Sequence, residues 1–365
     1  MQSAIKIDPI VESLENRHIQ ICDRLIGPGQ PVYMVAELSA NHHQDFERAA
    51  RLIDAAKYAG ADAIKLQTYT PDTITVRSDR NEFRIGGGTL WDGRQLYELY
   101  GEAFTPWDWQ PKLKQMANDA GLCLFSSPFD ETAVDFLEKM NVPAYKIASF
   151  ELVDIPLIRK TARTGKPVII STGMATVEEI EEALTVARQE GATEIALLKC
   201  TSAYPSPADE MNLRTIPALE RKFGVPAGLS DHTVGIAVPV AAVALGACII
   251  EKHLTLSRAD HGPDSAFSLE PDEFRTMVDA VRFAEKALGV SQFGPSAPEQ
   301  SSLRFRRSLF VVEDVKSDEV FTGKNVRSIR PAHGLHTRHL SAILGRRAVR
   351  DIERGTPLCW DLVSG

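Results

Sequence analysis

Eight short apolar segments, each followed by a helical pattern, are the feature of this sequence that most limits its fold. The segments are rich in β-branched residues, and the stretches between them carry apolar residues at helical spacing. In chain order the segments are Val32–Ser39, Ala61–Thr68, Cys123–Pro128, Ala144–Ser149, Pro167–Thr172, Ile195–Ser202, Pro226–Asp231 and Cys248–Leu256. Eight strand–helix units of this total length predict a (β/α)8 barrel, the TIM-barrel fold, over residues 32–289.

The ends of the helical stretches agree with this reading. The stretches after the first and fifth segments stop at Gly60 and Gly191, and glycine is the usual residue where a helix ends in a left-handed turn. A doubly wound open sheet is the alternative arrangement. It is disfavoured because no G-x-G-x-x-G motif follows the first segment. Residues 1–31 are then an N-terminal extension of the barrel.

The part after residue 289 has a different composition. Residues 290–304 form a linker rich in Pro, Ser and Gln, and residues 305–365 alternate short apolar runs with turn residues. This pattern predicts a small β-rich domain near the lower size limit for independent stability. Residues 290–365 hold 12 Lys and Arg against 8 Asp and Glu, a local charge of +4, and the rest of the chain carries −12. The net charge of −8 argues against a general nucleic-acid binder.

Cysteine usage and hydropathy bear on the compartment. The five cysteines (Cys22, Cys123, Cys200, Cys248 and Cys359) are widely spaced and include no C-x-x-C pair. We therefore expect neither a disulfide framework nor a cysteine-built zinc site, and a reducing cytoplasm fits. The N-terminus lacks the apolar core of a signal peptide, and no apolar stretch is long enough to span a bilayer. These features predict a soluble, cytoplasmic protein with no membrane partner.

One strand–helix unit is irregular. Between Thr70 and Trp107 lies an insertion that is rich in glycine and aromatic residues. Long loops after barrel strands sit on the catalytic face, so this insertion is a candidate substrate lid. The alternative is that it only decorates the surface.

Polar residues stand where the predicted strands end. Three pairs two residues apart share a strand face: Lys65 with Gln67, Ser230 with His232, and Glu251 with His253. The other polar residues at strand ends are Glu37, Ser126, Ser127, Lys146, Ser149, Ser171, Thr172 and Tyr204. Charged groups inside apolar strands are costly unless paired. Since the carboxyl ends of barrel strands meet at one face, these side chains are expected to converge where barrel enzymes keep their chemistry.

Each of these residues taken alone also has a structural reading. A strand histidine is often a hydrogen-bonded core residue, a barrel lysine can be an ion-pair partner, and Ser171 with Thr172 can cap a helix. Cys200 lies in an apolar strand and is disfavoured as a nucleophile. Together, however, two lysines, several hydroxyls and a helix N-terminus suit a phosphate dianion. Two histidines with a carboxylate beside one suit a divalent metal with open positions. The combination suggests condensation of a phosphorylated enol with a carbonyl.

At these residues the sequence resembles a known family. The segments AELSANH, GADAIKLQTY, YKIASFE, STGMA, KCTSAYP, GLSDHT and EKHLTL, in this order, resemble the sialic-acid synthase family, and RSIRPAHGL resembles its antifreeze-like (SAF) domain. The resemblance covers essentially the whole chain and implies condensation of phosphoenolpyruvate with an amino-sugar aldehyde. Within the family, FRIGGGTLWDGRQLYELYGEAFTPWDW and the run Ser265–Arg282 resemble pseudaminic acid synthases. Neuraminate and legionaminate synthases usually lack the GGTLWDG…LYELY segment.

The resemblance implies roles for individual residues. For phosphoenolpyruvate they are Lys65, Lys146, Ser149, Ser171, Ser230 and either Ser126 or Ser127; for the sugar they are Gln67, Glu151, Tyr204, Glu251 and Asp264. His232 and His253 would hold a divalent metal (Mn²⁺, Mg²⁺ or Co²⁺), and Glu37, Lys65, Glu251 and the two histidines would act in catalysis. Arg330 would reach a neighbour's site in a domain-swapped homodimer. One departure is that Ala203 precedes Tyr204 where neuraminate synthases often have Asn, which puts sugar contacts there in doubt.

The function implied by the resemblance is that of a pseudaminic acid synthase. The alternatives within the family are an N-acetylneuraminate or an N,N'-diacetyllegionaminate synthase. A different enzyme class is a Schiff-base aldolase with Lys65 or Lys146 as nucleophile, because barrels support many chemistries. A non-enzymatic alternative takes the tail domain as an ice-binding or carbohydrate-binding module, but it does not explain the converging strand ends.

Overall fold

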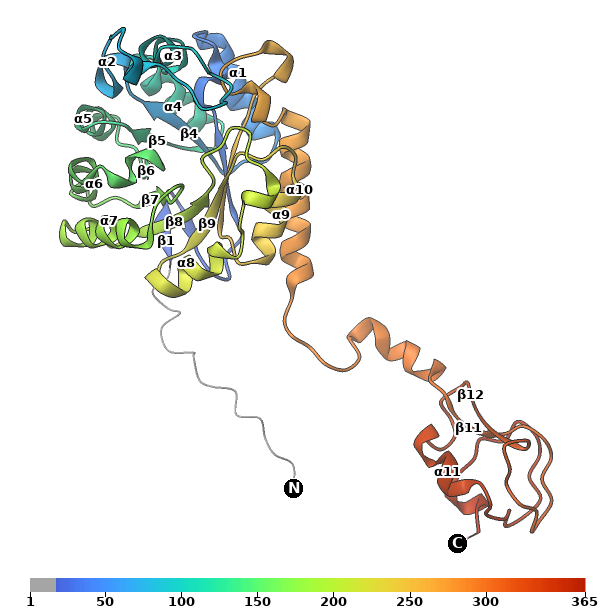
Figure 1. The fold of residues 1–365 in the computed structure, drawn as a ribbon. Coiled ribbons are helices and arrows are strands. Elements are labelled where there is room, and N and C mark those ends of the chain that lie inside the picture. The colour runs from blue at the N-terminus through green and yellow to red at the C-terminus, as the bar shows by residue number, and fades with distance from the viewer. Residues whose placement is uncertain (1–17, 365) are drawn as a thin grey trace. The chain divides into compact units, whose positions relative to one another are not determined.

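The computed structural model describes residues 18–364, and the chain divides into two compact units, the first ending at Gly289 and the second beginning at Val290 (Figure 1). In the first unit, eight parallel strands close into a barrel in the order β10-β3-β4-β5-β6-β7-β8-β9. The strands are β3 (Tyr33–Glu37), β4 (Ala63–Thr68), β5 (Cys123–Pro128), β6 (Tyr145–Ile147), β7 (Val168–Ser171), β8 (Ile195–Cys200), β9 (Ala227–Asp231) and β10 (Ile249–His253). The predicted barrel is confirmed, and the open-sheet alternative is wrong because β10 pairs with β3.

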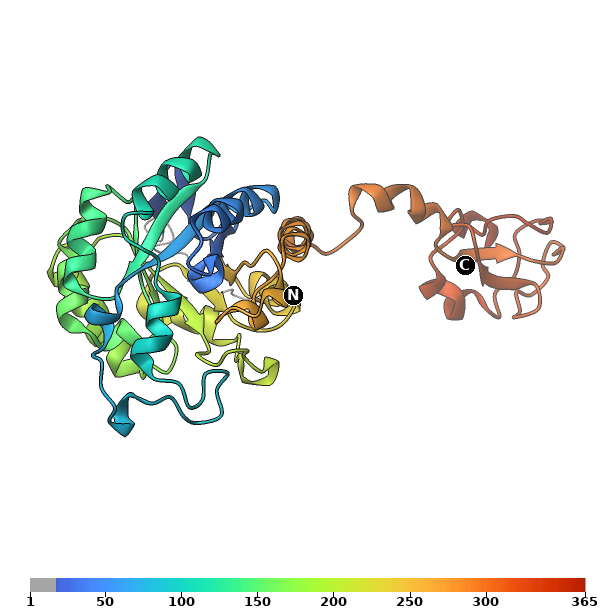
Figure 2. The ribbon, with the colours of Figure 1, turned by 90° about the horizontal axis from the view of Figure 1, so that it is seen from above.

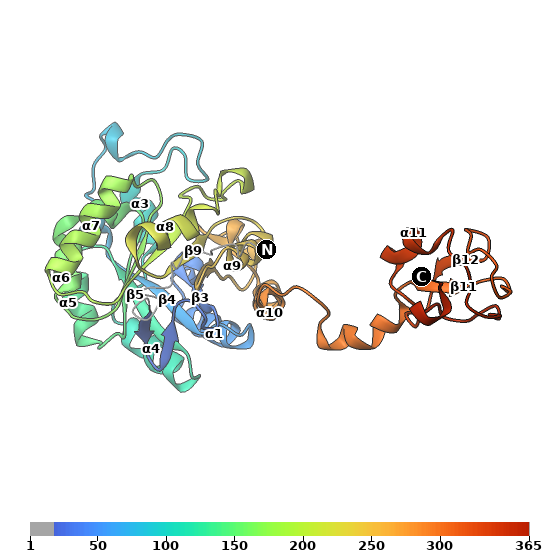
Figure 3. The ribbon, with the colours of Figure 1, turned by 90° about the horizontal axis from the view of Figure 1, so that it is seen from below.

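A ring of helices covers the outside of the strands, as the views from above and below show (Figures 2 and 3). Local sequence explains their ends: Asp45 accepts hydrogen bonds from two backbone N–H groups at the start of α1, and the Thr176 and Glu179 side chains form a capping box at the start of α7. Gly60 and Gly191 follow these two helices with positive φ, as predicted. The covering helices are α1 (Phe46–Tyr58), α4 (Gln110–Asp119), α5 (Glu131–Lys139), α6 (Ile155–Ala162), α7 (Val177–Gln189), α8 (Thr215–Phe223), α9 (Ala237–Ala244) and α10 (Pro271–Leu288).

The barrel interior is apolar at the end formed by the amino ends of the strands, which we call the lower half; the upper half lies at their carboxyl ends. Alternate residues of the strands point inward in the lower half, and an antiparallel hairpin closes this end of the barrel. The hairpin consists of β1 (Ile19–Ile21) and β2 (Arg24–Ile26), which the sequence analysis placed in the N-terminal extension. Its buried side chains form one cluster with those of the strands: Ile19, Ile21, Ile26, Tyr33, Val35, Ala63, Cys123, Phe125, Ala144, Ile169, Ala196, Leu198, Cys248 and Ile249.

A disulfide bond joins the hairpin to the barrel. Cys22, in the hairpin turn, is bonded to Cys123, the first residue of β5, across a separation of 101 residues. We expected no disulfide framework from the sequence, and this single bond is a departure from that expectation. Sequence spacing gave no sign of it, because only the packing of the hairpin under the barrel brings the two residues together. The other three cysteines are free.

The insertion after β4 crosses the rim of the barrel at the end formed by the carboxyl ends of the strands, opposite the hairpin. It contains α2 (Pro71–Ile74), α3 (Leu96–Ala103) and, between them, an extended stretch with a tight turn. In Figures 2 and 3 this stretch reaches toward the loop that follows β8. The predicted position of the insertion on the face formed by the strands' carboxyl ends is confirmed by a ring contact between Trp91 and Tyr204.

The second unit has its own small core. Two antiparallel strands, β11 (Ser308–Val311) and β12 (Val326–Ile329), and the short helix α11 (Leu340–Ile343) pack around buried residues that include Leu309, Phe321 and Leu358. Turns and isolated bridges make up most of the rest. Part of the predicted linker is helical, since a 3₁₀ helix spans Ala297–Phe305. Among residues 18–364, no helix has the length and apolar character needed to cross a membrane.

Candidate active site

The inward face of the strands changes from apolar to polar toward their carboxyl ends. On β3 the inward series runs from Val35 to Glu37, on β7 from Ile169 to Ser171, and on β10 from Ile249 to Glu251 and His253. Because side chains alternate along a strand, each polar residue continues an apolar row two residues below it. The strand pairing places these positions beside one another around the barrel, for example Glu37 beside Lys65 and Glu251 beside Ser230. The sequence prediction of convergence is confirmed for these residues.

Lys65 stands at the centre of the polar layer. Its Nζ lies 2.7 Å from Glu37 Oε2, 3.5 Å from Glu251 Oε1 and 3.3 Å from the hydroxyl of Ser127. Burial lowers the pKa of Lys65, but the carboxylates of Glu251 and Glu37 outweigh it and hold the pKa above its ordinary value. The lysine is therefore a cation. Ser230 donates to Glu251 Oε1 at 3.0 Å, which fixes that carboxylate from the other side.

Lys146 occupies a different environment. Its Nζ donates to Ser171 Oγ at 2.6 Å and to the carbonyl of Ile147 at 3.1 Å, and both acceptors are neutral. Burial lowers its pKa, and the charge of Glu251 opposes this only in part. A buried ammonium without a contacting carboxylate is a site that an anionic ligand would stabilise.

A small cradle of hydroxyl groups follows Lys146 and Ser171 at the ends of their strands. The backbone N–H of Gly173 donates to Ser149 Oγ at 3.1 Å. A Cβ at position 173 would lie 2.3 Å from Ser202 Oγ and 2.7 Å from Ser149 Oγ, so glycine is required for this close approach. Lys146, Ser149 and Ser171 thus sit together as predicted. Ser202 belongs to the same cluster and was not predicted.

The two serines that end β5 point in opposite directions. Ser127 faces Lys65 inside the barrel. Ser126 shares a hydrogen bond of 2.6 Å with Thr68, whose hydroxyl donates to Gln110 on α4, so Ser126 lies between the strands and the helices. Of the two candidates left open by the sequence, the geometry favours Ser127, because neighbouring strand residues cannot both face the interior.

Two histidines define the other side of the site. His232 and His253 end β9 and β10, are both buried, and have ring centroids 5.2 Å apart. Nδ1 of His232 lies 3.2 Å from the carbonyl oxygen of Thr201. A carbonyl can only accept, so this hydrogen bond puts a proton on Nδ1, and Nε2 is the nitrogen that a neutral His232 ring would offer to a ligand. Nδ1 of His253 is buried without a hydrogen-bond partner among the described residues, and it lies 3.9 Å from Asp264 Oδ2.

These donors fit a divalent metal that keeps open positions. Burial, together with the neighbouring His232, holds the pKa of His253 well below its ordinary value, so this ring is neutral, as a ligand must be. Burial also lowers the pKa of His232, but Cys200 and the Thr201 carbonyl outweigh it and raise the value. In residues 18–364 no set of three or more His, Cys, Asp or Glu side chains is arranged around a metal position. The described residues thus offer two imidazoles, and a metal held by them would need water or substrate for its remaining ligands.

The residues predicted to contact the sugar line the same opening. Gln67 Nε2 donates to Glu37 Oε1 at 3.0 Å and to Ser39 Oγ at 2.9 Å. Asp264 accepts from the backbone N–H of Ala40, and burial raises its pKa. The ring of Tyr204 lies 4.5 Å from that of His232.

Glu151 follows Ser149 just past the end of β6. Burial raises its pKa to about 7, against the opposing charge of Lys146. Its Oε2 is buried without a hydrogen-bond partner among the described residues. A carboxyl group with a pKa near neutrality can hold or release a proton at physiological pH.

Several functional neighbours were not predicted. Phe267 packs against both histidines and Tyr204, with ring centroids 4.9 Å from His253 and 5.3 Å from Tyr204. Burial raises the pKa of Cys200, but His232 outweighs it and brings the value down to about 7. Cys200 comes two residues after Leu198 on β8, and Leu198 points inward. This spacing could have predicted that Cys200 also faces the site, but the apolar strand made it look like an ordinary core residue.

One charged pair in the last two strands has a structural role. Lys252 donates to Asp231 Oδ2 at 2.5 Å, and both side chains are fully buried. They alternate with Glu251 and His253 on β10 and with Ser230 and His232 on β9, so they point out of the barrel. The pair joins the two strands that carry the histidines.

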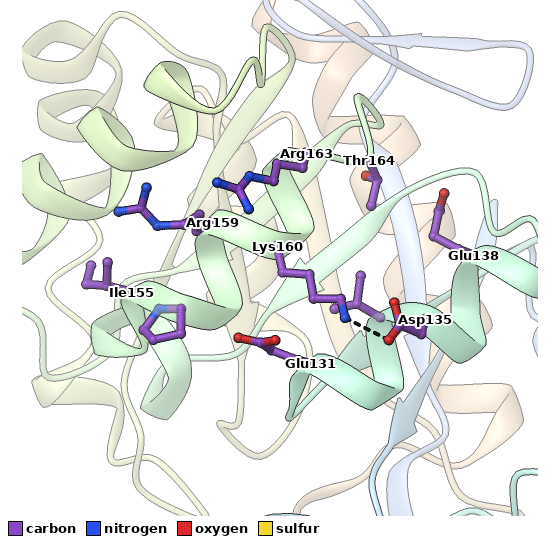
Figure 4. A pocket seen from close by; sticks show the side chains of 10 residues that line it. Glu131, Asp135, Glu138, Ile155, Arg159, Lys160, Arg163 and Thr164 are labelled. Atoms are coloured by element: carbon purple, nitrogen blue, oxygen red, sulfur yellow. Dashed lines mark hydrogen bonds and ion pairs between the residues drawn. The ribbon is translucent and has the colours of Figure 1, made fainter.

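A groove on the outer wall of the barrel is separate from this site. It has a volume of about 630 Å³ between α5 and α6, and its lining is largely charged (Figure 4). Lys160 pairs with Asp135 at 2.7 Å across it. None of the residues predicted for catalysis lines the groove.

Arg330 lies in the second unit, directly after β12, and is exposed.

Comparison with known proteins agrees with the geometry. Residues 52–293 match the NeuB family, and residues 306–364 match the SAF domain. The chain belongs to the NeuB family. The predicted resemblance to sialic-acid synthases and the predicted C-terminal SAF domain are thereby confirmed.

Individual relatives place the chain more finely within the NeuB family. A pseudaminic acid synthase of Campylobacter jejuni is 48% identical over 90% of this chain and 95% of its own length. One of Helicobacter pylori is 46% identical over 91% of this chain and 98% of its own length. The crystal structure of an N-acetylneuraminic acid synthetase from Leptospira borgpetersenii, in complex with citrate, has a TM-score of 0.70 at 33% identity and covers 79% of this chain and 95% of its own.

Proposed function

We propose that this protein is a pseudaminic acid synthase. It condenses phosphoenolpyruvate with 2,4-diacetamido-2,4,6-trideoxy-L-altrose and water, and gives pseudaminic acid and phosphate. The observation that carries the proposal is the division of one barrel opening into a lysine and hydroxyl side and a histidine side, bridged by Glu251. The identity of 46–48% to pseudaminic acid synthases supports the choice of sugar.

The lysine side suits phosphoenolpyruvate. Lys146, Ser171, Ser149 and the cradle at Gly173 supply an ammonium, hydroxyls and a close backbone approach for the phosphate or carboxylate. Lys65 supplies a second cation, and Ser127 and Ser230 flank it. The negative charge of the bound substrate would pair with the Lys146 ammonium, which contacts no carboxylate. Because this ammonium is already buried and oriented, binding would require little further ordering of the side chain.

The carboxylates suit the charge changes of the reaction. When carbon 3 of phosphoenolpyruvate attacks the aldehyde, positive charge develops at carbon 2, and Glu37 stands 2.7 Å from Lys65 beside that region. Water then adds to carbon 2, and the C–O bond to phosphate breaks. Glu251 accepts from Ser230 and lies 3.5 Å from Lys65, and as a carboxylate it would accept the proton of that water.

The histidine side suits the aldehyde. His232 and His253 would hold Mn²⁺, Mg²⁺ or Co²⁺, which as a Lewis acid would polarise the aldehyde oxygen. Tyr204 and Asp264 lie next to the histidines, and Gln67 donates to Glu37. Together with Glu151 they would orient the amino sugar.

The test is a phosphate-release assay with phosphoenolpyruvate and a panel of amino sugars. We expect the highest kcat/KM with the trideoxy altrose derivative. Equal or better turnover of N-acetylmannosamine, or of the precursor of N,N'-diacetyllegionaminic acid, would favour the corresponding synthase instead. Borohydride with a ketone substrate separates the aldolase alternative, because it would inactivate a Schiff-base enzyme through Lys65 or Lys146 and leave a synthase active.

We also propose a domain-swapped homodimer in the cytoplasm, in which the SAF domain of one subunit brings Arg330 to the other's site. The net +4 of residues 290–365 and the −12 of the rest of the chain support such docking. Two inactive variants, Arg330→Ala and Lys65→Ala, are mixed under conditions that exchange subunits. If Arg330 acts in trans, a mixed dimer has one complete site and activity returns to roughly half. No recovery in dimers whose exchange is shown by mass would contradict the arrangement.

A further inference from the structure

The tip of the insertion holds one partly buried side chain in an otherwise exposed stretch. Residues 86–93 are exposed except for Trp91. Its indole lies 5.6 Å from the ring of Tyr204, centroid to centroid, at an angle of 50°. Its Nε1–H donates to the carbonyl oxygen of Pro263 at 3.2 Å. The insertion is therefore anchored at its tip by Trp91 to two loops that line the site.

Local hydrogen bonds hold this tip in shape. The Asp92 carboxylate accepts from the backbone N–H groups of Gly88 and Thr89 at 2.8 and 2.9 Å. Ile85 N–H donates to the carbonyl of Arg94 at 2.9 Å, and Gly93 N–H donates to the carbonyl of Ile85 at 2.8 Å. A loop with this internal bonding presents its indole without a large ordering cost on ligand binding.

Trp91 extends an aromatic wall beside the two histidines. We use this name for Trp91, Tyr204 and Phe267, which are linked by the ring contacts of Tyr204. Tyr204 lies 4.5 Å from His232, and Phe267 lies 4.9 Å from His253. Tyr204 and Phe267 therefore flank the position where the aldehyde, carbon 1 of the sugar, would bind, and Trp91 lies beyond Tyr204, toward the other end of the sugar chain.

The other two aromatic residues that the sequence suggested for the lid are engaged elsewhere. Tyr97 donates to Asp72 at 3.0 Å and carries the guanidinium of Arg77 over its ring at 4.4 Å. Tyr100 packs edge-on against Tyr69 at 5.7 Å. Among the ring contacts of the described residues, that of Trp91 with Tyr204 is the one that connects the insertion to the rest of the wall.

The chemistry of Trp91 limits what it can recognise. An indole has one polar group, the Nε1–H, and the carbonyl of Pro263 already accepts it. The rest of the ring can offer only apolar contact. A hydroxyl group placed against it would lose water and gain no hydrogen bond, whereas a methyl group would gain buried apolar area.

We propose that Trp91 is a specificity-determining residue that selects the methyl group at carbon 6 of the sugar over a hydroxymethyl group. This inference rests on the proposed function, since it takes the trideoxy sugar as the substrate. It assigns the choice between 6-deoxy and 6-hydroxy sugars to one side chain of the insertion.

The experiment compares two sugars that differ by one oxygen atom: the 6-deoxy substrate and its 6-hydroxy analogue. For the wild-type protein we expect kcat/KM to favour the 6-deoxy sugar by up to about 100-fold, the scale on which an apolar pocket rejects an added hydroxyl. Trp91→Ala should reduce this ratio about tenfold, which corresponds to the loss of about 1.4 kcal/mol of discrimination. The change should appear in the KM for the 6-deoxy sugar, with the KM for phosphoenolpyruvate unchanged. Trp91→Phe should restore most of the ratio.

Leu90→Ala is the matched control, because Leu90 is the exposed apolar neighbour in the same loop and should leave the ratio unchanged. If Trp91→Ala keeps the wild-type ratio, or lowers kcat for both sugars equally, the assignment of specificity to Trp91 is wrong. If the wild type turns over neither sugar, the proposed function itself fails, and the two failures are distinguishable.

Discussion

The lower and upper halves of the barrel interior are built from the same strands but have opposite chemistry. Below, inward side chains such as Val35, Ile169 and Ile249 pack with the hairpin in a closed apolar cluster. Two residues further along the same strands, Glu37, Ser171 and Glu251 form a network of ion pairs and hydrogen bonds. The alternation of the strand continues unchanged, and only the residue type differs. The comparison assigns stability to one half and chemistry to the other, and the following predictions test this division.

The largest effect is expected in the upper half. His232→Ala and His253→Ala should each lower kcat about a thousandfold or more, because loss of a Lewis acid removes several kcal/mol of transition-state stabilisation. The free energy of unfolding should change little, and a chelator should inactivate the wild type reversibly. Steady-state phosphate release and denaturant unfolding measure the two quantities. Full activity in excess chelator would contradict the metal proposal.

The next effect concerns the lower half alone. Reducing the Cys22–Cys123 bond, or changing Cys22 to Ser, should lower the free energy of unfolding by about 4 kcal/mol, since the bond closes a long loop. Turnover at 25 °C should stay the same, because the bond lies at the apolar end of the barrel. Denaturant unfolding with and without reductant measures this, and Cys359→Ser, at a free cysteine, is the control. A loss of kcat would show that the two halves are coupled. In a reducing cytoplasm the pair would be present as thiols.

A smaller effect depends on pH at the rim of the upper half. Burial, with the charges of His43 and Arg48, lowers the pKa of His42 from 6.5 to about 4. Its Nδ1 accepts from Gln44 N–H at 3.1 Å, so Nε2 carries the proton and donates to Thr105, at the end of the insertion. The unfolded chain takes up a proton first, so the stability due to neutral His42 is complete above pH 6.5 and is lost as the pH falls toward 4.

At pH 5 this loss amounts to about 2 kcal/mol. His42→Asn keeps an acceptor for Gln44 but does not titrate, so its free energy of unfolding should fall less steeply between pH 7 and pH 5. Denaturant unfolding across that range measures both slopes. Equal slopes in the two proteins would show that His42 is not the group responsible.

The smallest and sharpest test uses two residues of β7 on the same face. Ile169→Val, in the apolar cluster, should lower the free energy of unfolding by about 1 kcal/mol and leave kinetics unchanged. Ser171→Ala removes the hydroxyl 2.6 Å from Lys146 Nζ and should raise the KM for phosphoenolpyruvate about tenfold, because the ammonium loses the side chain that orients it toward the substrate. The reverse assignment of the two effects would mean that the division between the halves is wrong.

Periodic patterns made most of the fold predictable. Eight strand–helix units, the helix stops at Gly60 and Gly191, and the two-residue spacing of Lys65 with Gln67 follow from local chain geometry. The same spacing placed Glu251 and His253 on one inward face. These predictions depend on sequence neighbours, which constrain each other directly through the backbone.

The tertiary structure alone decided which distant groups meet. The pairing of Cys22 with Cys123 requires the hairpin to close the lower end of the barrel. The choice of Ser127 over Ser126, the outward pairing of Lys252 with Asp231, and the contact of Trp91 with Tyr204 depend on strand rotation and loop path. Such contacts join residues far apart in the chain, so the sequence specifies them only through the packing of the whole barrel.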